Sequence, residues 1–343
     1  MGCAEERAVP ITHAVTYILP IKSPRRVPDE LTIYLDDLSR SGVAEIIVVD
    51  GSNPEVFADL ATRCGSRVRH VCVDEDLLGL ANGKVAGVLT GVRHASHEKL
   101  ILADDDVRHD ATTITKLDRA LDDADIVRPQ NYFEPLPWHA CLDTARTLIN
   151  RATGGDWPGT LGVRRLALVR AGGYDGNVLF ENLELVRTVL AAGGREHRPL
   201  DLFVLRRPPD TTHFWSQRVR QAYDEFARPR RLAFWLSLVP GLALMSAWYG
   251  IEMLAVAAGV AVAVAEVGRR IGQGSTVFPL RASLVAPLWV MERAITAWLA
   301  LGMRLARGGV WYSGRRLARA ATSHRELMRR LHARTTEATG MER

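Results

Sequence analysis

Hydrophobic and polar positions divide the 343-residue chain into parts of different character. Over residues 14–226, short apolar runs alternate with stretches that have helical spacing. Residues 227–303 are mainly apolar, whereas residues 304–343 are polar and rich in arginine. The pattern predicts an N-terminal extension (1–13), an α/β domain, a membrane region and a basic cytoplasmic tail.

Four apolar runs in the first part predict β-strands. They are Ala14–Ile21, Glu45–Asp50, Arg67–Val73 and Lys99–Ala103. Helical spacing is found at Asp29–Ser39 and Gly83–His94. The fully apolar interior of EIIVVD is typical of a parallel sheet covered on both faces. Strands that alternate with helices therefore predict a doubly wound, mostly parallel sheet.

The longest apolar run, Leu232–Val267, is interrupted only by Glu252 and Glu266. A membrane-spanning helix needs about 20 residues, so residues 232–267 can hold two spans with a turn near Gly250. The cationic residues on both flanks suit a hairpin whose two ends face the cytoplasm. They are Arg228, Arg230, Arg231, Arg269 and Arg270. The alternative is a buried helical hairpin in a soluble protein.

A further apolar stretch at 282–303 carries Glu292 and Arg293 near its centre. Each mid-bilayer charge costs about 2.5–3.5 kcal/mol on insertion scales. A full span would also export a tail, 304–343, that has ten Arg against three Glu. We therefore expect a re-entrant or interfacial segment with the tail near anionic lipid, and a third full span as the alternative. The protein is expected at the inner or plasma membrane, multi-pass, with its catalytic domain cytoplasmic.

Charge and cysteine content narrow the function classes. The formal net charge is +5, and only four of the 44 basic residues are lysine, so arginine enrichment is a property of the whole chain. A nucleic-acid partner is therefore not expected. The four cysteines form no C-x-x-C pair and no zinc-type spacing, which indicates reduced thiols.

Candidate chemistry follows the second and fourth predicted strands. Asp50 ends the second strand, and Asp104, Asp105 and Asp106 follow the fourth. Residues i and i+2 of an extended segment point the same way, so Asp104 and Asp106 can share one Mg²⁺ or Mn²⁺. An acidic turn that caps a helix beginning near Asp110 is the alternative. Neither of the glycine-rich phosphate-loop motifs occurs.

Several motifs in order resemble one family. They are IIVVDGS, NGKVAGVLTGVRHA, LILADDD, GTLGVRRLALVRAGGYDG, FENLEL and WSQRVRQAY. This series is similar to the family 2 glycosyltransferases of GT-A fold. PLRASL and VWYSGRRL resemble the C-terminal part of bacterial ceramide-glucosyltransferase-like members. The resemblance implies a membrane-bound, hexosyltransferase-type enzyme that uses a nucleotide-sugar donor and Mg²⁺ or Mn²⁺.

The resemblance also implies roles for individual residues. It assigns the donor to Pro20, Asp50, Lys84, Asp104, Gln217, Arg218 and Arg220. It assigns the metal to the D-x-D pair, Asp104 and Asp106, and the acceptor side to Trp138, Trp157 and Asn182. A divalent metal with Arg or Lys would stabilise the charge that builds on the departing diphosphate.

Two positions depart from the family pattern. The Trp of Q-x-x-R-W is Gln221, which disfavours a processive polysaccharide synthase. The family's Glu-Asp pair is Glu181-Asn182, and an amide cannot serve as the general base. Either Glu181 or Glu184 then takes the proton, or the chemistry needs no strong base, or the enzyme is impaired. Glu181 is the favoured base, and an ion pair with Arg187 is the alternative role of Glu184.

The sequence thus predicts a membrane glycosyltransferase that is inverting and metal-dependent. Its acceptor is expected to be a hydroxyl of a lipid or lipid-linked molecule, given the apolar hairpin and the basic tail. The alternatives are a sugar-nucleotide pyrophosphorylase and a non-catalytic membrane scaffold that binds nucleotide-sugar.

Overall fold

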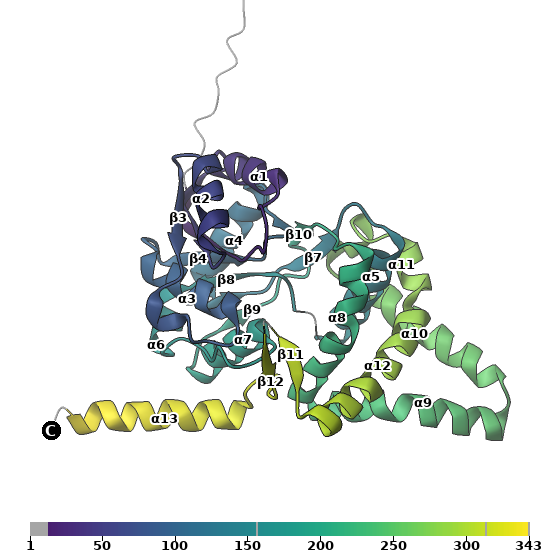
Figure 1. Cartoon of the computed structure of the whole chain (residues 1–343). Helices are drawn as coiled ribbons and strands as arrows, with labels where there is room; N and C mark the ends of the chain where they lie inside the picture. Colours follow the sequence, from purple (N-terminus) through teal and green to yellow (C-terminus); the bar gives the residue numbers. More distant parts are fainter. Residues whose placement is uncertain (1–12, 156, 313, 342–343) are drawn as a thin grey trace, which may run out of the picture.

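A mixed, mostly parallel β-sheet forms the centre of the computed structural model, which describes residues 13–155, 157–312 and 314–341 (Figure 1). The described strand order is β3-β2-β1-β4-β8-β6-β9. Strands β3, β2, β1 and β4 are parallel, and β8 runs antiparallel to β4 and β6. The bounds are β1 His13–Ile21, β2 Val43–Asp50, β3 Val68–Cys72, β4 Lys99–Ala103, β6 Ile126–Val127, β8 Thr160–Arg164 and β9 Glu196–His197. The α/β class and the four predicted strands are confirmed, and the N-terminal extension apart from His13 lies outside the described residues.

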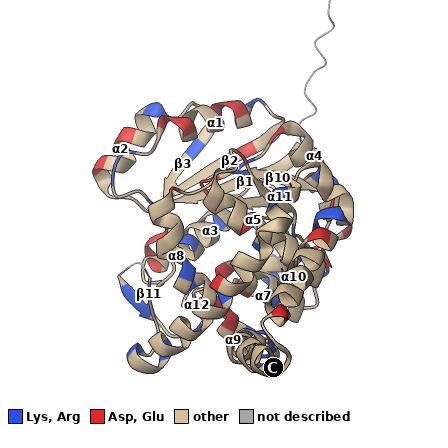
Figure 2. Cartoon of the chain, turned by 90° about the vertical axis from the view of Figure 1, so that its right-hand side faces the viewer, with Lys and Arg blue, Asp and Glu red and all other residues tan. Residues whose placement is uncertain are grey.

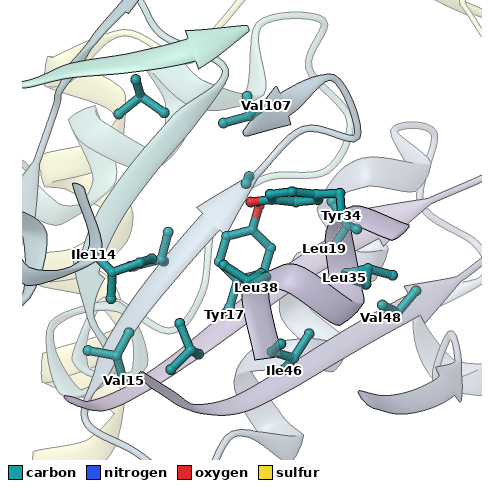
Figure 3. Packing of buried hydrophobic residues seen from close by; sticks show 14 of the residues in the cluster. Val15, Tyr17, Leu19, Tyr34, Leu35, Leu38, Ile46, Val48, Val107 and Ile114 are labelled. Atoms are coloured by element: carbon teal, nitrogen blue, oxygen red, sulfur yellow. The ribbon is translucent and has the colours of Figure 1, made fainter. Parts of the chain in front are cut away.

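Helices cover both faces of this sheet because alternate strand residues point to opposite sides. One face packs against α1 Asp29–Ser39, α2 Pro54–Arg63 and α4 Ala111–Asp123. There Tyr17, Leu35 and Leu38 are buried together, and the Tyr34 hydroxyl donates to that of Tyr17 at 3.2 Å (Figure 3). The other face packs against α3 Gly83–His94, α6 Arg165–Arg170 and α7 Glu181–Ala191.

A smaller sheet and two helices extend this domain. Strand order β5-β10-β7 combines β5 Val107–Arg108, β10 Phe203–Arg206 and β7 Gln130–Phe133. The two helices are α5 Trp138–Thr153 and α8 Thr211–Tyr223. A short 3₁₀ turn, η2 Asp224–Ala227, follows α8, and another, η1 Glu75–Leu77, lies between β3 and α3.

The long apolar run forms α9 Pro229–Tyr249 and α10 Glu252–Arg270, with the turn at Gly250 and Ile251 (Figure 1). Within the described part of the chain, α9 alone is long and apolar enough to cross a membrane. Helix α10 instead packs on α5 and α12 through buried Ala261, Ala265 and Gly268. A Cβ at Gly268 would overlap the Leu148 carbonyl oxygen, so the backbones of α10 and α5 are in direct contact here. The expected pair of spans therefore has support for one helix only, because small residues on α10 serve protein packing.

The stretch 282–303, for which a re-entrant or interfacial segment is expected, is mainly helical. It forms α11 Leu280–Leu284 and one continuous helix, α12 Ala286–Arg307, after the turn η3 Ile271–Thr276. One face of α12 is buried, and Arg293 there donates to the Gln221 carbonyl oxygen at 2.6 Å. Glu292 lies 3.7 Å from Arg218. The two charges are therefore accommodated by the protein itself, while Leu288 and Leu299 on the other face are exposed.

Most of the basic tail has regular secondary structure. It forms the hairpin β11 Val310–Tyr312 and β12 Arg315–Leu317, followed by α13 His324–Met341. The backbone N–H groups of Leu179 and Phe180 donate to the carbonyl oxygens of Arg319 and Ala320 at 3.0 and 2.8 Å. A charge count overlooks the buried apolar residues that dock this segment, which are Val310, Leu317 and Ala320.

Replacing Asp143 should destabilise the junction of α5 and α8. Its Oδ1 accepts from Arg218 Nη2 at 2.7 Å, and both side chains are buried. Asp143→Ala leaves a buried guanidinium without its nearest carboxylate, a change that costs about 3–5 kcal/mol. Chemical denaturation should show this loss, whereas Asp36→Ala, which removes an exposed partner of Arg40, should cost about 1 kcal/mol or less. Equal losses in the two variants would contradict the buried ion pair.

Candidate functional site

Polar side chains from separate segments meet at the carboxyl ends of the parallel strands. Asp104 follows β4, and its N–H donates to the Gly159 carbonyl oxygen at 2.8 Å. Lys84 lies in the first turn of α3, where the N-cap residue Asn82 accepts from the Lys84 N–H at 3.1 Å. Glu181 is the first residue of α7. The chain thus brings one ammonium and two carboxylates to one edge of the sheet, where α/β proteins bind ligands.

Lys84 is the centre of this group. Its Nζ lies 2.5 Å from Asp104 Oδ1, 2.9 Å from Glu181 Oε1 and 3.2 Å from Asn182 Oδ1. Burial by itself would lower the pKa of Lys84, but Asp104 and Glu181 raise it well above its ordinary value. Lys84 is therefore a permanent cation at the site.

Arg206, at the end of β10, contacts both carboxylates of the D-x-D pair. Its Nε lies 2.8 Å from Asp106 Oδ2, and its Nη2 lies 3.5 Å from Asp104 Oδ2. Burial raises the pKa of Asp106 even though Arg206 lowers it. A Cβ at Gly159 would lie 2.8 Å from Asp104 Oδ2, so a larger residue there would displace this carboxylate. Helix α4 is capped by Asp110 itself, whose Oδ1 accepts from Thr113 N–H at 2.7 Å. The pair is thus free of the capping role.

The two carboxylates fit a hard divalent cation. Asp104 and Asp106 reach the same guanidinium, and Asp106 Oδ1 is buried with no hydrogen-bond partner among the described residues. Those residues contain no cluster of three or more His, Cys, Asp or Glu side chains that could hold a metal. One or two carboxylates completed by water and substrate phosphate are the usual Mg²⁺ environment.

Two adjoining cavities open at this edge, with volumes of about 260 and 430 Å³. The larger lies against Pro20, Gly51 and Val73, which stand at the ends of β1, β2 and β3. Lys84 and Tyr312 line both cavities. The larger cavity is within the size range of small-molecule sites, and the smaller continues it past Lys84.

The smaller cavity is strongly basic. Its cationic side chains are Lys84, Arg146, Arg206, Arg220, Arg228, Arg231 and Arg293. Its carboxylates are Asp104, Glu181, Asp224 and Glu225. Seven cations minus four carboxylates leave a formal excess of three positive charges, which suits an anionic ligand.

The predicted donor residues fall into two groups. Those that line the cavities are Pro20, Lys84, Asp104 and Arg220. Asp50 is buried and turned away, since its carboxylate accepts from the Ser52 N–H at 2.8 Å and lies 3.1 Å from His70 Nε2. Burial would raise the pKa of Asp50, but these hydrogen bonds lower it. Gly51, the residue that follows β2, lies at the cavity wall instead.

Gln217 and Arg218 also lie away from the cavities. Arg218 is buried in its ion pair with Asp143, and Gln217 Nε2 donates to Ser216 Oγ at 3.3 Å. Only one face of α8 and its continuation into η2 reaches the ligand space. That face carries Arg220, Gln221 and Asp224.

The predicted acceptor residues are likewise divided. Trp157 lines the basic cavity, whereas Trp138 is 59% exposed and packs against Trp215 with ring centres 6.1 Å apart. Asn182 Nδ2 donates to the Pro158 carbonyl oxygen at 2.9 Å, and its Oδ1 faces the ammonium of the site. Asn182 therefore holds the loop that contains Pro158 beside the candidate site.

Glu184 has a structural contact in place of the expected site role. It is fully buried, and its Oε2 accepts from the Thr322 N–H at 2.6 Å. Burial raises the pKa of Glu184. Arg187 donates to the Thr322 carbonyl oxygen at 3.0 Å, so both side chains fasten the returning C-terminal segment. Glu181 and Glu184 share a helix face, but this segment covers the second of them.

Several residues of the site have no counterpart in the sequence prediction. Arg206 is the last residue of strand β10, so the strand-end rule that located Asp104 could have found it. Tyr312 comes from the C-terminal hairpin, and Arg315 on the same hairpin donates to the Gly79 carbonyl oxygen at 2.7 Å. No local signal reveals that this hairpin folds over the site.

Asp224 is the other residue that sequence reasoning missed. It begins η2 and lines the basic cavity. Burial raises the pKa of Asp224 to about 7, although Arg220 and Arg228 lower it. A carboxylate that titrates near neutrality inside a cavity is a candidate proton acceptor.

In comparisons with known proteins, no protein family and no curated protein matches the chain. Similar solved structures include a mannosyltransferase from Pyrobaculum calidifontis in complex with GDP-Man and Mn²⁺, with 16% identity, 84% of this chain and 89% of that chain covered, and a TM-score of 0.49. Another is glucosyl-3-phosphoglycerate synthase from Mycobacterium tuberculosis in complex with Mn²⁺ and UDP-glucose, with 14% identity, coverage of 61% and 76%, and a TM-score of 0.38.

Removing the Glu184 carboxylate should loosen the segment that follows the C-terminal hairpin. In Glu184→Ala, the buried Thr322 N–H loses its acceptor, at a cost of about 1–3 kcal/mol. Hydrogen exchange should therefore accelerate in the segment 318–323. Glu181→Gln serves as the control and should leave exchange there unchanged. Unaltered exchange in Glu184→Ala would show that this contact does not hold the segment.

Proposed function

We propose that this protein is a metal-dependent GT-A-type glycosyltransferase that transfers a sugar from a nucleotide-sugar to a hydroxyl of a lipid or lipid-linked acceptor. The observation that carries the proposal is the pair of adjoining cavities that meet at Lys84. One lies at three strand ends and has the size for a nucleoside, and the other is basic and is lined by Asp104 of the D-x-D pair. The ordered family motifs along the sequence support the same function.

The donor would span both cavities. Its nucleoside would lie between Pro20 and Gly51, with Tyr312 and Arg315 of the hairpin on the other side. Its diphosphate would lie near Lys84, where guanidinium groups can bind phosphate oxygens in pairs. Asp104 and Asp106 would hold Mg²⁺ or Mn²⁺, which when bound supplies Lewis-acid stabilisation of the departing diphosphate.

Asp224 is the proposed general base in place of the family's Asp, which is Asn182 here. The acceptor oxygen would bond to the anomeric carbon as the bond from that carbon to the diphosphate oxygen breaks. The hydroxyl proton would pass to Asp224, and the electron pair would leave with the nucleoside diphosphate. One such displacement inverts the anomeric centre. Glu181 is held by Lys84 and thus positions that cation.

Membrane attachment is proposed from the exposed apolar surface of the C-terminal helices. Residues 232–249 of α9 carry no charge, and Leu244, Trp248 and Tyr249 are exposed. Helices α1 and α2, in contrast to this part of α9, carry many charged residues, drawn as red and blue segments in Figure 2. Contiguous exposed apolar surface of this kind marks membrane contact. We place α9 in the inner or plasma membrane and the cavities on its cytoplasmic side, which gives the site access to lipid.

Transfer of labelled sugar from a panel of UDP- and GDP-sugars to extracted membrane lipids tests the function. Wild-type protein with Mn²⁺ should form a labelled lipid. Asp106→Asn should lower the rate about 100-fold, the scale of losing one electrostatic contact to the transition state. Asp105→Asn, an exposed neighbour in the same turn, is the matched control and should retain activity. Absence of any labelled lipid, or equal rates in both variants, would refute the proposal.

The pH profile tests Asp224. Only its ionised form accepts a proton, so the wild-type rate should rise as pH increases through about 7. Asp224→Asn should lower the rate by about 10²–10⁴ and remove this rise. Glu181→Gln should retain the rise, whatever its effect on the maximal rate. An unchanged profile in Asp224→Asn would assign the base elsewhere.

A further inference from the structure

A third cavity, apolar and about 620 Å³ in volume, lies among α5, α9, α10 and α12. Apart from Arg231 and Thr153, its lining side chains are aliphatic or aromatic. They include Phe234, Leu238, Leu242, Val264 and Met291. Hydrocarbon is the chemistry that such a lining takes up from water.

The apolar cavity adjoins the basic one. Arg231 lines both. Trp289 lines the basic cavity and Trp235 the apolar one, and their rings meet edge to face with centres 5.4 Å apart. A molecule with an anionic part and a hydrocarbon part can therefore contact both spaces along Arg231.

Four arginines on this side of the basic cavity have few carboxylate partners. They are Arg146 on α5, Arg228 before α9, Arg231 on α9 and Arg293 on α12. Glu225 lies 3.3 Å from Arg228 and 3.2 Å from Arg231 and is shared between them. Asp143 lies 3.6 Å from Arg146 but is already held by Arg218.

These guanidinium groups also have unused donors. The Nε atoms of Arg146, Arg228 and Arg293 are buried and have no hydrogen-bond partner among the described residues. A phosphate group presents several acceptor oxygens and negative charge, which matches clustered guanidinium donors. The D-x-D pair, beside which the donor diphosphate is proposed to lie, contacts Arg206 and none of these four arginines. The four arginines can therefore bind a second anion.

We propose that the acceptor carries a phosphate group next to its hydrocarbon chain. The phosphate binds Arg146, Arg228, Arg231 and Arg293, and the chain enters the apolar cavity. The hydroxyl-bearing head then extends towards Asp224. This assignment of the acceptor rests on the proposed function, but binding of the phosphate and the chain can be measured without turnover.

Calorimetric binding of decyl phosphate, decanol and inorganic phosphate to the full chain in a bulky neutral detergent tests the proposal. Decyl phosphate should bind about tenfold or more tightly than either other probe, since it alone fills both spaces. Each methylene added from hexyl to decyl phosphate should raise the affinity by up to about fourfold. Equal affinity for decanol and decyl phosphate, or for decyl and inorganic phosphate, would overturn the proposal.

Variants separate the two parts of the site. Arg231→Gln should lower the affinity for decyl phosphate about tenfold or more and leave the affinity for decanol unchanged. Ala257→Phe fills the apolar cavity. It should remove the dependence of alkyl phosphate affinity on chain length and leave the affinity for inorganic phosphate unchanged. Ala255→Phe, on an exposed position of the same helix, is the matched control and should bind as wild type.

Donor binding in the same samples separates this proposal from the proposed function. Nucleoside diphosphate binding with Mn²⁺ but no preference for decyl phosphate would overturn the acceptor assignment alone. Preference for decyl phosphate without any nucleoside diphosphate binding would support the lipid-phosphate site and overturn the glycosyltransferase.

Discussion

The contacts of Lys84 with Asp104 and Glu181 are the interaction on which the site depends. They join the start of α3, the end of β4 and the start of α7, three segments far apart in the chain. Without the ammonium, Asp104 would keep only its 3.5 Å contact with Arg206, and Glu181 would lose its ion pair with Lys84. Removing one partner of a buried ion pair is strongly destabilising, so Lys84 holds these three segments together at the carboxyl edge of the sheet.

Around this cation the site is divided by charge and polarity. Strand ends and the C-terminal hairpin enclose one cavity, where the nucleoside is proposed to lie, and arginines from α5, α8, α9 and α12 make the next cavity basic. The apolar cavity then continues among the helices that present exposed hydrocarbon surface. One path thus leads from the cavity at the strand ends, past the basic cavity, to exposed apolar surface, an order that suits the proposed transfer from a nucleotide-sugar to an amphiphilic acceptor.

Local pattern predicted much of the sheet but less of the site. Strands β1 to β4 were predictable because their apolar runs are bounded by turn residues, and the strand-end rule located Asp104 and Asp106. Tertiary contacts determine which of the remaining candidates reach the cavities. Helix spacing places Glu184 on the same face as Glu181, but the C-terminal segment covers Glu184. Asp224 and Tyr312 carry no local signal. Hydropathy likewise overlooked the small-residue face by which α10 packs on α5.

Calorimetric titration of GDP and UDP in the presence of Mn²⁺ tests the central claim, that the edge around Lys84 binds a nucleoside diphosphate. Wild-type protein should bind one of them, and Lys84→Met should lower the affinity about tenfold or more, because an ammonium contact to phosphate is lost. Equal affinity of wild type and Lys84→Met, or no binding of either nucleotide to wild type, would contradict it.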